Sequence, residues 1–535
     1  MNGYLIAIIL IIAFWAAVYI LDKKGILAKH NMSAWGPFVM WRTKRGRNLI
    51  DKLSRPHRFW NGYALISKGI VAAIMFGMTA LLLWESTLVV NIPAENAPGF
   101  DMVLGIPGIN PIIPLWYGIL GMIVAVIIHE FAHGILTRVH GMGVKSLGIV
   151  WMVIPMGAFT EPDEEALEKT TKKKRTAVYA VGPATNIIAA VIFAVLFSSV
   201  AMSAVAPTYD APMASTVYSG GPANMAGIPV GAQIIAIDGV ELEMDGYLSV
   251  NAPDPNNPVQ VEYYYNGEFF TKEVISGVIL TQIVQNMPSG EAGLKPGMML
   301  YSLNGEIIRN GNDFSRVMEE IPFNPEAPTA VPIVVYAYNS ENHTYEVVES
   351  VTEITPTSKL EYYETRGMST EGIEEMAFLG VSTAYLGMVV TDPQALIDSM
   401  AHPFAGDDSL NDYFQSFLTY VTLPLKGYQP FPDALAAVYE PQGIFAGMSS
   451  DSFWIMTNCF YWLFWINLML GLTNALPAIP LDGGYIFRDW LDSFLQKVRK
   501  TMPEKERLRI VDSVAWAFAL LILFLILWMV IGPRL

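Results

Sequence analysis

The stretch Ile127-Ile128-His129-Glu130-Phe131-Ala132-His133-Gly134 lies inside a long apolar segment, residues 112–137. On a helix, His129 and His133 stand one turn apart on the same face, so both imidazoles can reach one metal ion. Neutral imidazole suits Zn²⁺, and the adjacent Glu130 can act as general base on a metal-bound water. Ionisable groups in an apolar span are energetically costly and usually functional. The alternative is a buried polar network with a purely structural role.

A third ligand is expected, because a catalytic zinc ion has three protein ligands and one open position. The remaining histidines lie outside the apolar segments. The best candidate is Asp482, which follows the apolar run of residues 453–476 in the segment Asn474-Ala475-Leu476-Pro477-Ala478-Ile479-Pro480-Leu481-Asp482-Gly483-Gly484. The two prolines break the helix, and the two glycines let the chain turn and leave room for backbone to approach.

The composition indicates a membrane protein. Hydrophobic residues make up 53% of the 535 residues, charged residues only 15%, and the mean hydropathy is +0.37. The net charge of −16 argues against nucleic acid as a partner, and a single cysteine excludes a disulfide within the chain. Six segments are apolar and long enough to cross a bilayer. They are approximately residues 3–21, 64–90, 112–137, 176–205, 453–476 and 511–532.

The basic residues predict the orientation of these spans. Segments 22–63, 138–175 and 482–510 contain 24 of the 33 lysines and arginines, whereas segment 207–452 contains 7 against 32 acidic residues. By the positive-inside rule the three basic segments are cytosolic. The acidic segment and both termini are then extracytoplasmic, in a multi-pass protein of the cell membrane. The first span has no basic residues before it, so we expect it to be retained rather than cleaved.

The acidic segment contains a repeat with an offset of 66 residues. Gly221-Pro222-Ala223-Asn224-Met225-Ala226-Gly227-Ile228, followed by Asp238-Gly239, corresponds to Met287-Pro288-Ser289-Gly290-Glu291-Ala292-Gly293-Leu294, followed by Asn304-Gly305. Each copy predicts a short helix, a strand and a tight turn. The two copies resemble PDZ domains of bacterial and archaeal proteases. That resemblance implies peptide binding by strand addition, including the binding of peptide C-termini. The alternative is a spacer without a working groove.

The fold class we expect is a membrane α-helical protein of about six transmembrane helices, with an inserted extracytoplasmic α+β region of two tandem PDZ-like domains. We divide the chain into an N-terminal membrane region (1–111), a first half of the catalytic core (112–206), PDZ-like domain 1 (207–276), PDZ-like domain 2 with a linker (277–377), a gate or membrane-surface segment (378–452) and a second half of the core (453–535). Within 378–452, residues 410–425 and 431–438 are amphipathic enough to lie on the outer leaflet.

Three motifs resemble those of the site-2 protease family of intramembrane metalloproteases. They are HExxH at His129–His133, the segment from Asn474 through Pro477 to Asp482-Gly483, and Gly182-Pro183-Ala184-Thr185-Asn186. The resemblance implies Zn²⁺ bound by His129, His133 and Asp482, with Glu130 activating water.

The same resemblance implies cleavage of single-span membrane proteins within the lipid bilayer, in regulated intramembrane proteolysis. Asn186 and Asn474 would position substrate, or else form hydrogen bonds between helices. The β-prone segment 144–160 would form a membrane-dipping hairpin whose edge pairs with an unwound substrate. Three other classes stay open: a non-enzymatic PDZ scaffold, a zinc protease acting on soluble polypeptides, and a transporter.

Overall fold

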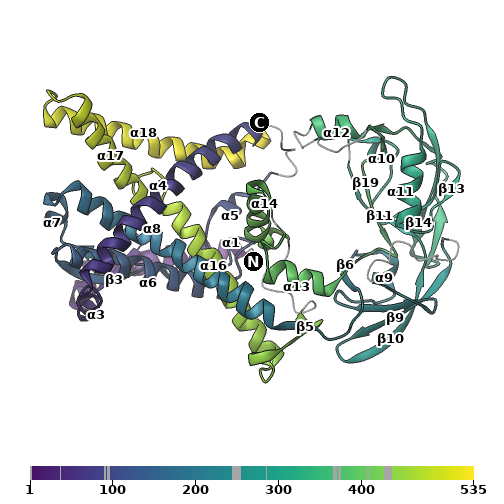
Figure 1. Ribbon diagram of the computed structural model, residues 1–535, viewed down its shortest axis with the longest axis horizontal. Coiled ribbons are helices and arrows are strands. Elements are labelled where there is room, and N and C mark those ends of the chain that lie inside the picture. The colour runs from purple at the N-terminus through teal and green to yellow at the C-terminus, as the bar shows by residue number, and fades with distance from the viewer. Residues whose placement is uncertain are drawn as a thin grey trace. The chain divides into compact units, whose positions relative to one another are not determined.

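The structure is a computed structural model. It describes residues 3–36, 38–89, 92, 97–152, 154–243, 255–284, 286–365, 370, 375–406, 409–426 and 436–535. The chain divides into two compact units (Figure 1). One, the helical unit, comprises Met1–Phe197 and Met456–Leu535, and the other, the β-rich unit, comprises Ser198–Ile455.

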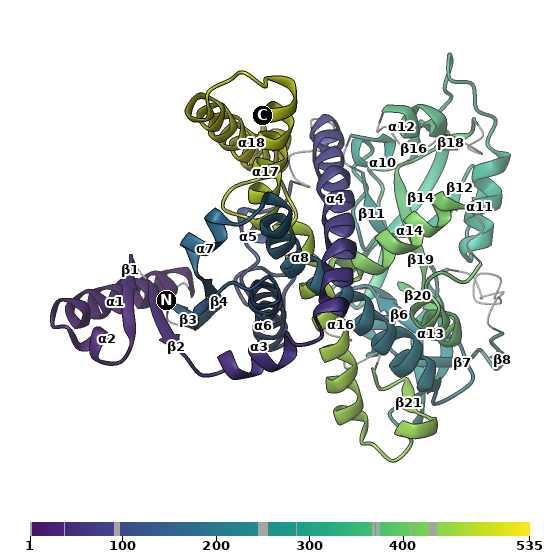
Figure 2. The same cartoon turned by 60° about the vertical axis from the view of Figure 1, so that its left-hand side comes forward.

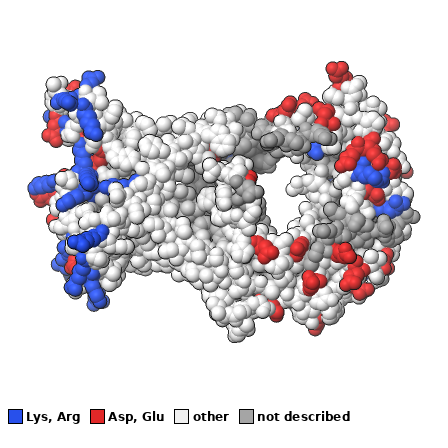
Figure 3. Space-filling view, in the orientation of Figure 1, with Lys and Arg blue, Asp and Glu red and all other residues white. Residues whose placement is uncertain are grey.

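Five helices in the described residues are long and apolar enough to cross a membrane. They are α4 (His57–Leu88), α6 (Leu115–Val139), α8 (Lys172–Val195), α16 (Ser450–Asn474) and α18 (Glu504–Ile531). They coincide with five of the six expected spans. The segment expected to form the first span is also helical, as α1 (Gly3–Lys23), with 21 residues. Lysines and arginines gather at one end of the helical unit (Figure 3).

Small residues allow the helices around the motifs to pack closely. A Cβ on Gly121 of α6 would lie 3.2 Å from the carbonyl oxygen of Trp462 in α16, and one on Gly471 of α16 would lie 3.1 Å from that of Pro183 in α8. Glycine at such contacts lets transmembrane helices approach backbone to backbone. Helix α16 therefore packs closely against both α6 and α8.

A four-stranded antiparallel sheet lies beside α6 (Figure 2). Its strands, in spatial order, are β1 (Met32–Trp35), β2 (Phe38–Thr43), β3 (Val144–Met152) and β4 (Ile154–Pro162). The hairpin expected over residues 144–160 is present as β3 and β4. Two further strands come from the segment expected to be only a basic loop, because β2 pairs with β3 from Val39↔Trp151 to Thr43↔Leu147. Strand β4 is the edge strand nearest the histidines.

The break after α16 leads directly into α17 (Asp482–Val498). A Cβ on Gly483 would lie 2.2 Å from the carbonyl oxygen of Ala475, and one on Gly484 would lie 2.5 Å from the carbonyl carbon of Ala478. Both glycines are thus needed for the tight return of the chain. Asp482 is the first residue of the new helix.

The β-rich unit contains two modules that correspond to the two repeats. The first module comprises β6 (Met213–Val217), α9 (Pro222–Met225), β7 (Gln233–Ile237), β8 (Val240–Glu241), β9 (Pro258–Tyr265), β10 (Glu268–Ile275) and β20 (Met388–Thr391). The second comprises β11 (Val278–Ile283), α10 (Pro288–Glu291), β12 (Met299–Leu303), β13 (Glu306–Ile307), α11 (Gly311–Glu320), β14 (Val331–Asn339), β15 (Thr344–Val347), β16 (Glu353–Ile354) and β19 (Val381–Tyr385). The tight turns predicted at Asp238-Gly239 and Asn304-Gly305 are confirmed, since all four residues have positive φ.

The division at residue 378 needs correction. Strands β19 and β20 lie beyond it, yet β19 is the edge of the second sheet, beside β11, and β20 is the edge of the first sheet, beside β6. Each module therefore receives its last strand from one pair of consecutive strands distant in sequence. Both modules share one apolar core, which includes Ile234, Val261, Leu300 and Val335.

The rest of segment 378–452 includes α13 (Pro393–Ala401) and α14 (Leu410–Val421). Helix α14 exposes the apolar side chains of Leu410, Phe414 and Phe417, as expected for a helix on a membrane surface. Strand β21 (Tyr439–Pro441) pairs with β5 (Val205–Pro207), which joins the end of this segment to the beginning of the β-rich unit. Most of the second expected amphipathic stretch, 431–438, lies outside the described residues.

The joint between the modules, where Gly387 contacts Gly221, gives the first prediction. Gly387, between β19 and β20, has φ +71°, and a Cβ there would lie 3.0 Å from Cα of Gly221. Gly387→Ala should lower the free energy of opening of strands β6 and β11 by about 1–3 kcal/mol through overpacking, measured by hydrogen exchange of their amides. Gly267→Ala is the control, because Gly267 has φ +87° with no atom within 4 Å of the added Cβ. Equal effects of both substitutions would contradict a packed joint.

Candidate metal centre

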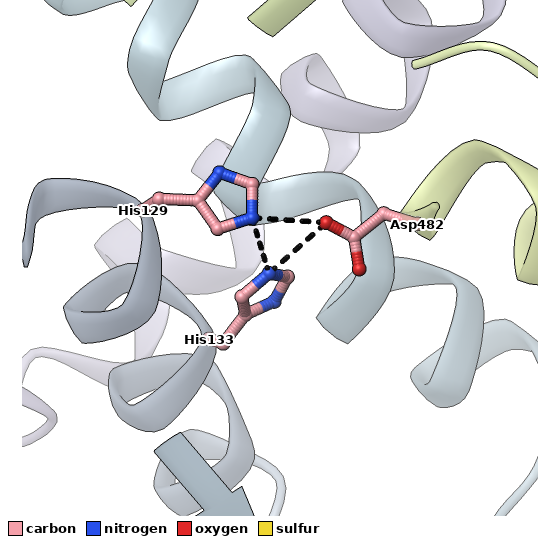
Figure 4. A group of neighbouring side chains, drawn as sticks. All are labelled: His129, His133 and Asp482. Carbon is pink, nitrogen blue, oxygen red and sulfur yellow. Dashed lines mark hydrogen bonds and ion pairs between the residues drawn. The ribbon is translucent and has the colours of Figure 1, made fainter. Parts of the chain in front are cut away.

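The candidate metal centre is formed by α6, α8 and the start of α17. His129 and His133 project from the same face of α6, and Asp482 approaches from the first turn of α17 (Figure 4). Nε2 of His129 lies 3.0 Å from Oδ2 of Asp482, and Nε2 of His133 lies 3.2 Å from the same oxygen. The two Nε2 atoms are 3.1 Å apart. Residues 353 positions apart in the sequence thus converge on one point.

The hydrogen bonds of the Nδ1 atoms indicate which nitrogens can bind a metal. Nδ1 of His133 lies 2.6 Å from the carbonyl oxygen of Val178, which can only accept, so Nδ1 carries the proton. Nδ1 of His129 lies 2.6 Å from Oδ1 of Asn186. Such partners fix the tautomer of metal-bound histidines. Both Nε2 atoms therefore present lone pairs to the same point as the Asp482 carboxylate.

Three electron-rich atoms so close together repel one another unless a cation lies between them. Ligands placed about 2.0–2.1 Å from Zn²⁺ in a tetrahedron are separated by about 3.3–3.4 Å. The observed separations of 3.0, 3.1 and 3.2 Å are close to that spacing. The residues present therefore fit Zn²⁺ with three protein ligands.

Gly182 of α8 keeps this point free of side chains. A Cβ at this position would lie 2.3 Å from Nε2 of His133 and 2.8 Å from Nε2 of His129. Any other residue would place carbon where the metal ion must sit. Gly182 opens the Gly-Pro-x-x-Asn motif, and its role at the centre follows from this contact.

Asn186 lies behind His129 and is fully buried. Its Nδ2 donates to the carbonyl oxygen of Ala125 and to Oδ1 of Asn467, both at 2.9 Å, which leaves Oδ1 to accept from His129. Asn467, itself fully buried, donates to the carbonyl oxygen of Leu463. The amide of Asn186 is thus engaged by the protein, which matches the helix-to-helix alternative rather than contact with substrate.

Glu130 is attached to the edge strand of the sheet. Its Oε2 accepts from the Thr160 amide at 2.6 Å, and its carbonyl oxygen accepts from the Thr160 hydroxyl at 2.7 Å. Within the described part of the chain, no hydrogen bond involves Oε1 of this carboxylate. One oxygen is therefore held in place while the other stays available.

A cavity of about 760 Å³ opens onto the three ligands and Glu130. Its wall includes Thr160 and Glu161 of β4, Tyr485 of α17, and the predicted residue Asn474, whose Nδ2 donates to the carbonyl oxygen of Leu470 at 3.1 Å. A role of Asn474 in positioning substrate stays a prediction. The cavity is large enough for several residues of an extended peptide.

Several residues of this site were not predicted from the sequence. Thr160, Asn467 and the Val178 carbonyl act through contacts that no local pattern reveals, although Asn467 could have been noticed as a polar residue in an apolar span. Met40 and Arg42 of β2 also line the cavity. They belong to the segment expected to be a cytosolic loop.

The contact at position 182 gives the second prediction. Gly182→Ala should lower the affinity for Zn²⁺ by about 100-fold or more, because even second-shell changes cost 10–100-fold. Competition of the metal-free protein with a chromophoric chelator measures this. Gly62→Ala in α4 is the control, since its Cβ meets no atom within 4 Å. Normal Zn²⁺ binding by Gly182→Ala would mean that the metal does not occupy this point.

Comparison with known proteins agrees with this centre. The family model described as peptidase family M50 matches residues 117–522. An uncharacterized protein of Methanocaldococcus jannaschii is 30% identical over 187 residues, which are 34% of this chain and 48% of the relative. The regulator of sigma-W protease RasP of Bacillus subtilis is 25% identical over 251 residues, 47% of this chain and 50% of the relative.

A third relative, the probable protease eep of Enterococcus faecalis, is 24% identical over 247 residues, 46% of this chain and 49% of the relative. The chain thus spans about half the length of each of these three curated relatives. The family model, in contrast, covers most of the chain and includes both histidines, Glu130 and Asp482. Together with the apolar helices, this match shows that the chain is a multi-pass membrane protein that belongs to peptidase family M50, the family of the site-2 proteases.

Proposed function

We propose that this chain is an intramembrane zinc endopeptidase that hydrolyses peptide bonds of single-span membrane proteins, in regulated intramembrane proteolysis. The observation that carries the proposal is the convergence of His129, His133 and Asp482 beside Glu130, on helices apolar enough to span a membrane. Two of the relatives bear the names of proteases, one of them a regulator of sigma-W protease. No nucleic acid takes part.

His129, His133 and Asp482 would hold Zn²⁺, which when bound polarises the scissile carbonyl and lowers the pKa of a water molecule. Glu130 would accept a proton from this water molecule and then transfer it. Its Oε2 is fixed by the Thr160 amide at 2.6 Å, so Oε1 receives the proton from water and delivers it to the leaving amine. The edge strand β4 keeps the base oriented through both of its contacts with Thr160.

Strand β4 also supports a way to present the substrate. A transmembrane helix hides its peptide bonds, so the substrate must be extended before hydrolysis. In the described residues β4 has a strand partner on one side only, and Phe159 to Pro162 line the cavity. An unwound substrate segment adds to this edge as a further strand, and the cavity satisfies backbone groups that lipid could not.

The orientation of the protein follows from its charges. The segments rich in lysine and arginine lie at one end of the helical unit (Figure 3), and we place this end in the cytosol. The acidic β-rich unit is then extracytoplasmic. The exposed apolar side chains of α14 would contact lipid at the outer surface.

The second module supports a docking role for the β-rich unit as a PDZ-like domain. A groove of about 230 Å³ lies between α11, with Phe314 and Met318, and the start of β19, with Val381. It is closed by the loop Phe378–Gly380 and by Lys359. The charged residues of this groove are Lys359 and Glu319. A peptide C-terminus with an apolar last side chain would place its carboxylate at Lys359. For the first module, the segment 244–254 lies outside the described residues.

The reaction is tested with purified protein in detergent and a model single-span substrate. Glu130→Gln should lower the cleavage rate by about 10²–10⁴-fold and leave about one zinc ion per chain. Glu165→Gln is the matched control and should cleave normally, because Glu165 is exposed and is not among the residues that line the cavity. Zinc-loaded wild type that cleaves an unfolded soluble polypeptide but no single-span substrate would favour the soluble-substrate protease, and absence of zinc would favour the scaffold.

The docking role is tested by fluorescence anisotropy with a labelled hexapeptide that ends in valine. Amidation of its C-terminus should weaken binding by about 10–100-fold, because hydrogen bonds to a charged group contribute about 1.5–3 kcal/mol. Lys359→Ala should weaken binding of the free acid, and Lys295→Ala in the same module serves as the control. Equal binding of acid and amide would indicate a spacer or an internal peptide site.

A further inference from the structure

Three contacts in register connect α8 to α17 along the faces that lead to the metal centre. Tyrosine, arginine and lysine of α8 oppose a tyrosine and two aspartates of α17. From the metal outward, the facing pairs are Tyr179 and Tyr485, Arg175 and Asp489, and Lys172 and Asp492. The positions on α17 are spaced by three or four residues, so they form one stripe of the helix.

The pair Arg175–Asp489 is the strongest of these contacts. Nε of Arg175 donates to Oδ2 of Asp489 at 2.8 Å, and Nη2 donates to Oδ1. A planar guanidinium that binds a carboxylate through two parallel hydrogen bonds fixes orientation as well as distance. Asp489 is only 3% exposed, so loss of its partner would leave a buried unpaired charge.

This pair fixes α17 with respect to the helix that faces the metal. Asp489 lies seven residues after Asp482, about two turns or ~10.5 Å along the same face. A shift of α17 by one residue would rotate its stripe by about 100° and turn the Asp482 carboxylate away from both histidines. The stacked rings of Tyr179 and Tyr485, with centroids 5.0 Å apart, fill the interval between the pair and the ligand.

Contacts of α17 with α18 do not fix its position against α8. Arg488 binds Asp512 of α18 at 2.6 Å, on a more exposed face, and Asp492 binds Arg507 of α18 at 2.6 Å as well as Lys172. The competing explanation is that the close packing of Gly483 and Gly484 against residues 475–478 suffices to place Asp482. The two explanations differ in what loss of the Arg175–Asp489 pair would do to metal binding.

We propose that Arg175 and Asp489 are positioning residues that hold the ligand Asp482 in reach of His129 and His133. They contact neither the metal nor the substrate and act through the orientation of α17. The proposal rests on the metal centre of the proposed function. Its readout is metal affinity, which remains measurable whether or not any substrate is cleaved.

The experiment measures Zn²⁺ affinity of the metal-free full chain in detergent, by competition with a chromophoric chelator. Asp489→Asn keeps the shape and removes the charge, and Arg175→Lys keeps the charge and removes the second hydrogen bond. Both should lower the affinity by about 10–100-fold, the range found for residues that orient metal ligands. The absorption spectrum of the Co²⁺-loaded variants should also change, because the carboxylate oxygen is displaced.

The matched controls are Asp512→Asn and Arg488→Lys, which weaken the pair between α17 and α18 in the same chemical way. These variants should keep Zn²⁺ affinity within about twofold of wild type. The charge exchange Arg175→Asp with Asp489→Arg should recover part of the affinity lost in either of its two single variants, Arg175→Asp or Asp489→Arg. Melting temperatures of the metal-free proteins identify any variant that fails to fold, and Arg175→Lys, which retains the cation, is the variant least subject to this failure.

Two outcomes would overturn the proposal. One is unchanged Zn²⁺ affinity and an unchanged Co²⁺ spectrum in both Asp489→Asn and Arg175→Lys, which would mean that the glycine contacts alone place Asp482. The other is an equal loss of affinity in the Asp512→Asn control, which would indicate general loosening of α17. If metal binding follows the proposal but no substrate is cleaved by wild type, the positioning role stands and the proposed reaction fails.

Discussion

The helical unit depends on one steric constraint: α6, α8 and α17 meet at a point where α8 has no side chain. The hydrogen atom of Gly182 faces the two histidine Nε2 atoms, so the helix backbone can approach the space reserved for a metal ion. The same close approach brings the Val178 carbonyl to Nδ1 of His133 and Asn186 to Nδ1 of His129. One missing side chain therefore permits the ligands, their tautomers and the cavity to coexist.

Local periodicity was sufficient to predict much of this centre. The i, i+4 spacing of His129 and His133 and the break before Asp482 are features of short segments, and a helix converts them directly into geometry. Asn467 and Thr160 depend on which helices and strands become neighbours, so no short pattern could reveal their contacts. The pairing of β2 with β3 joins residues more than one hundred positions apart, and composition alone marked that region only as basic.

The two repeats show the same difference between features of short segments, which the sequence predicts, and contacts between distant segments, which it does not. Their short helices, strands and tight turns followed from Gly, Asn and Asp at fixed positions, and the helices and strands are present as α9 and β7 and as α10 and β12. The boundary at residue 378 was wrong because the last strand of each sheet, β19 or β20, comes from later in the sequence. The sequence pattern of a strand of four or five residues is too short to predict the strand with which it pairs. Met40 and Arg42 likewise line the cavity although they are distant in sequence from the motifs, and both precede residue 117, where the family match begins.

The short link between β19 and β20 has a consequence for the local opening of the β-rich unit. Leu386 and Gly387 alone separate the two edge strands, and their backbone atoms bond to both modules, through Gly277 on one side and Tyr218 and Ala223 on the other. If β19 or β20 separates from its sheet, the hydrogen bonds of this link that hold the other strand are lost as well. We therefore expect the two modules to open together as a single foldon, so that a ligand that stabilises either edge slows solvent access to the backbone of both.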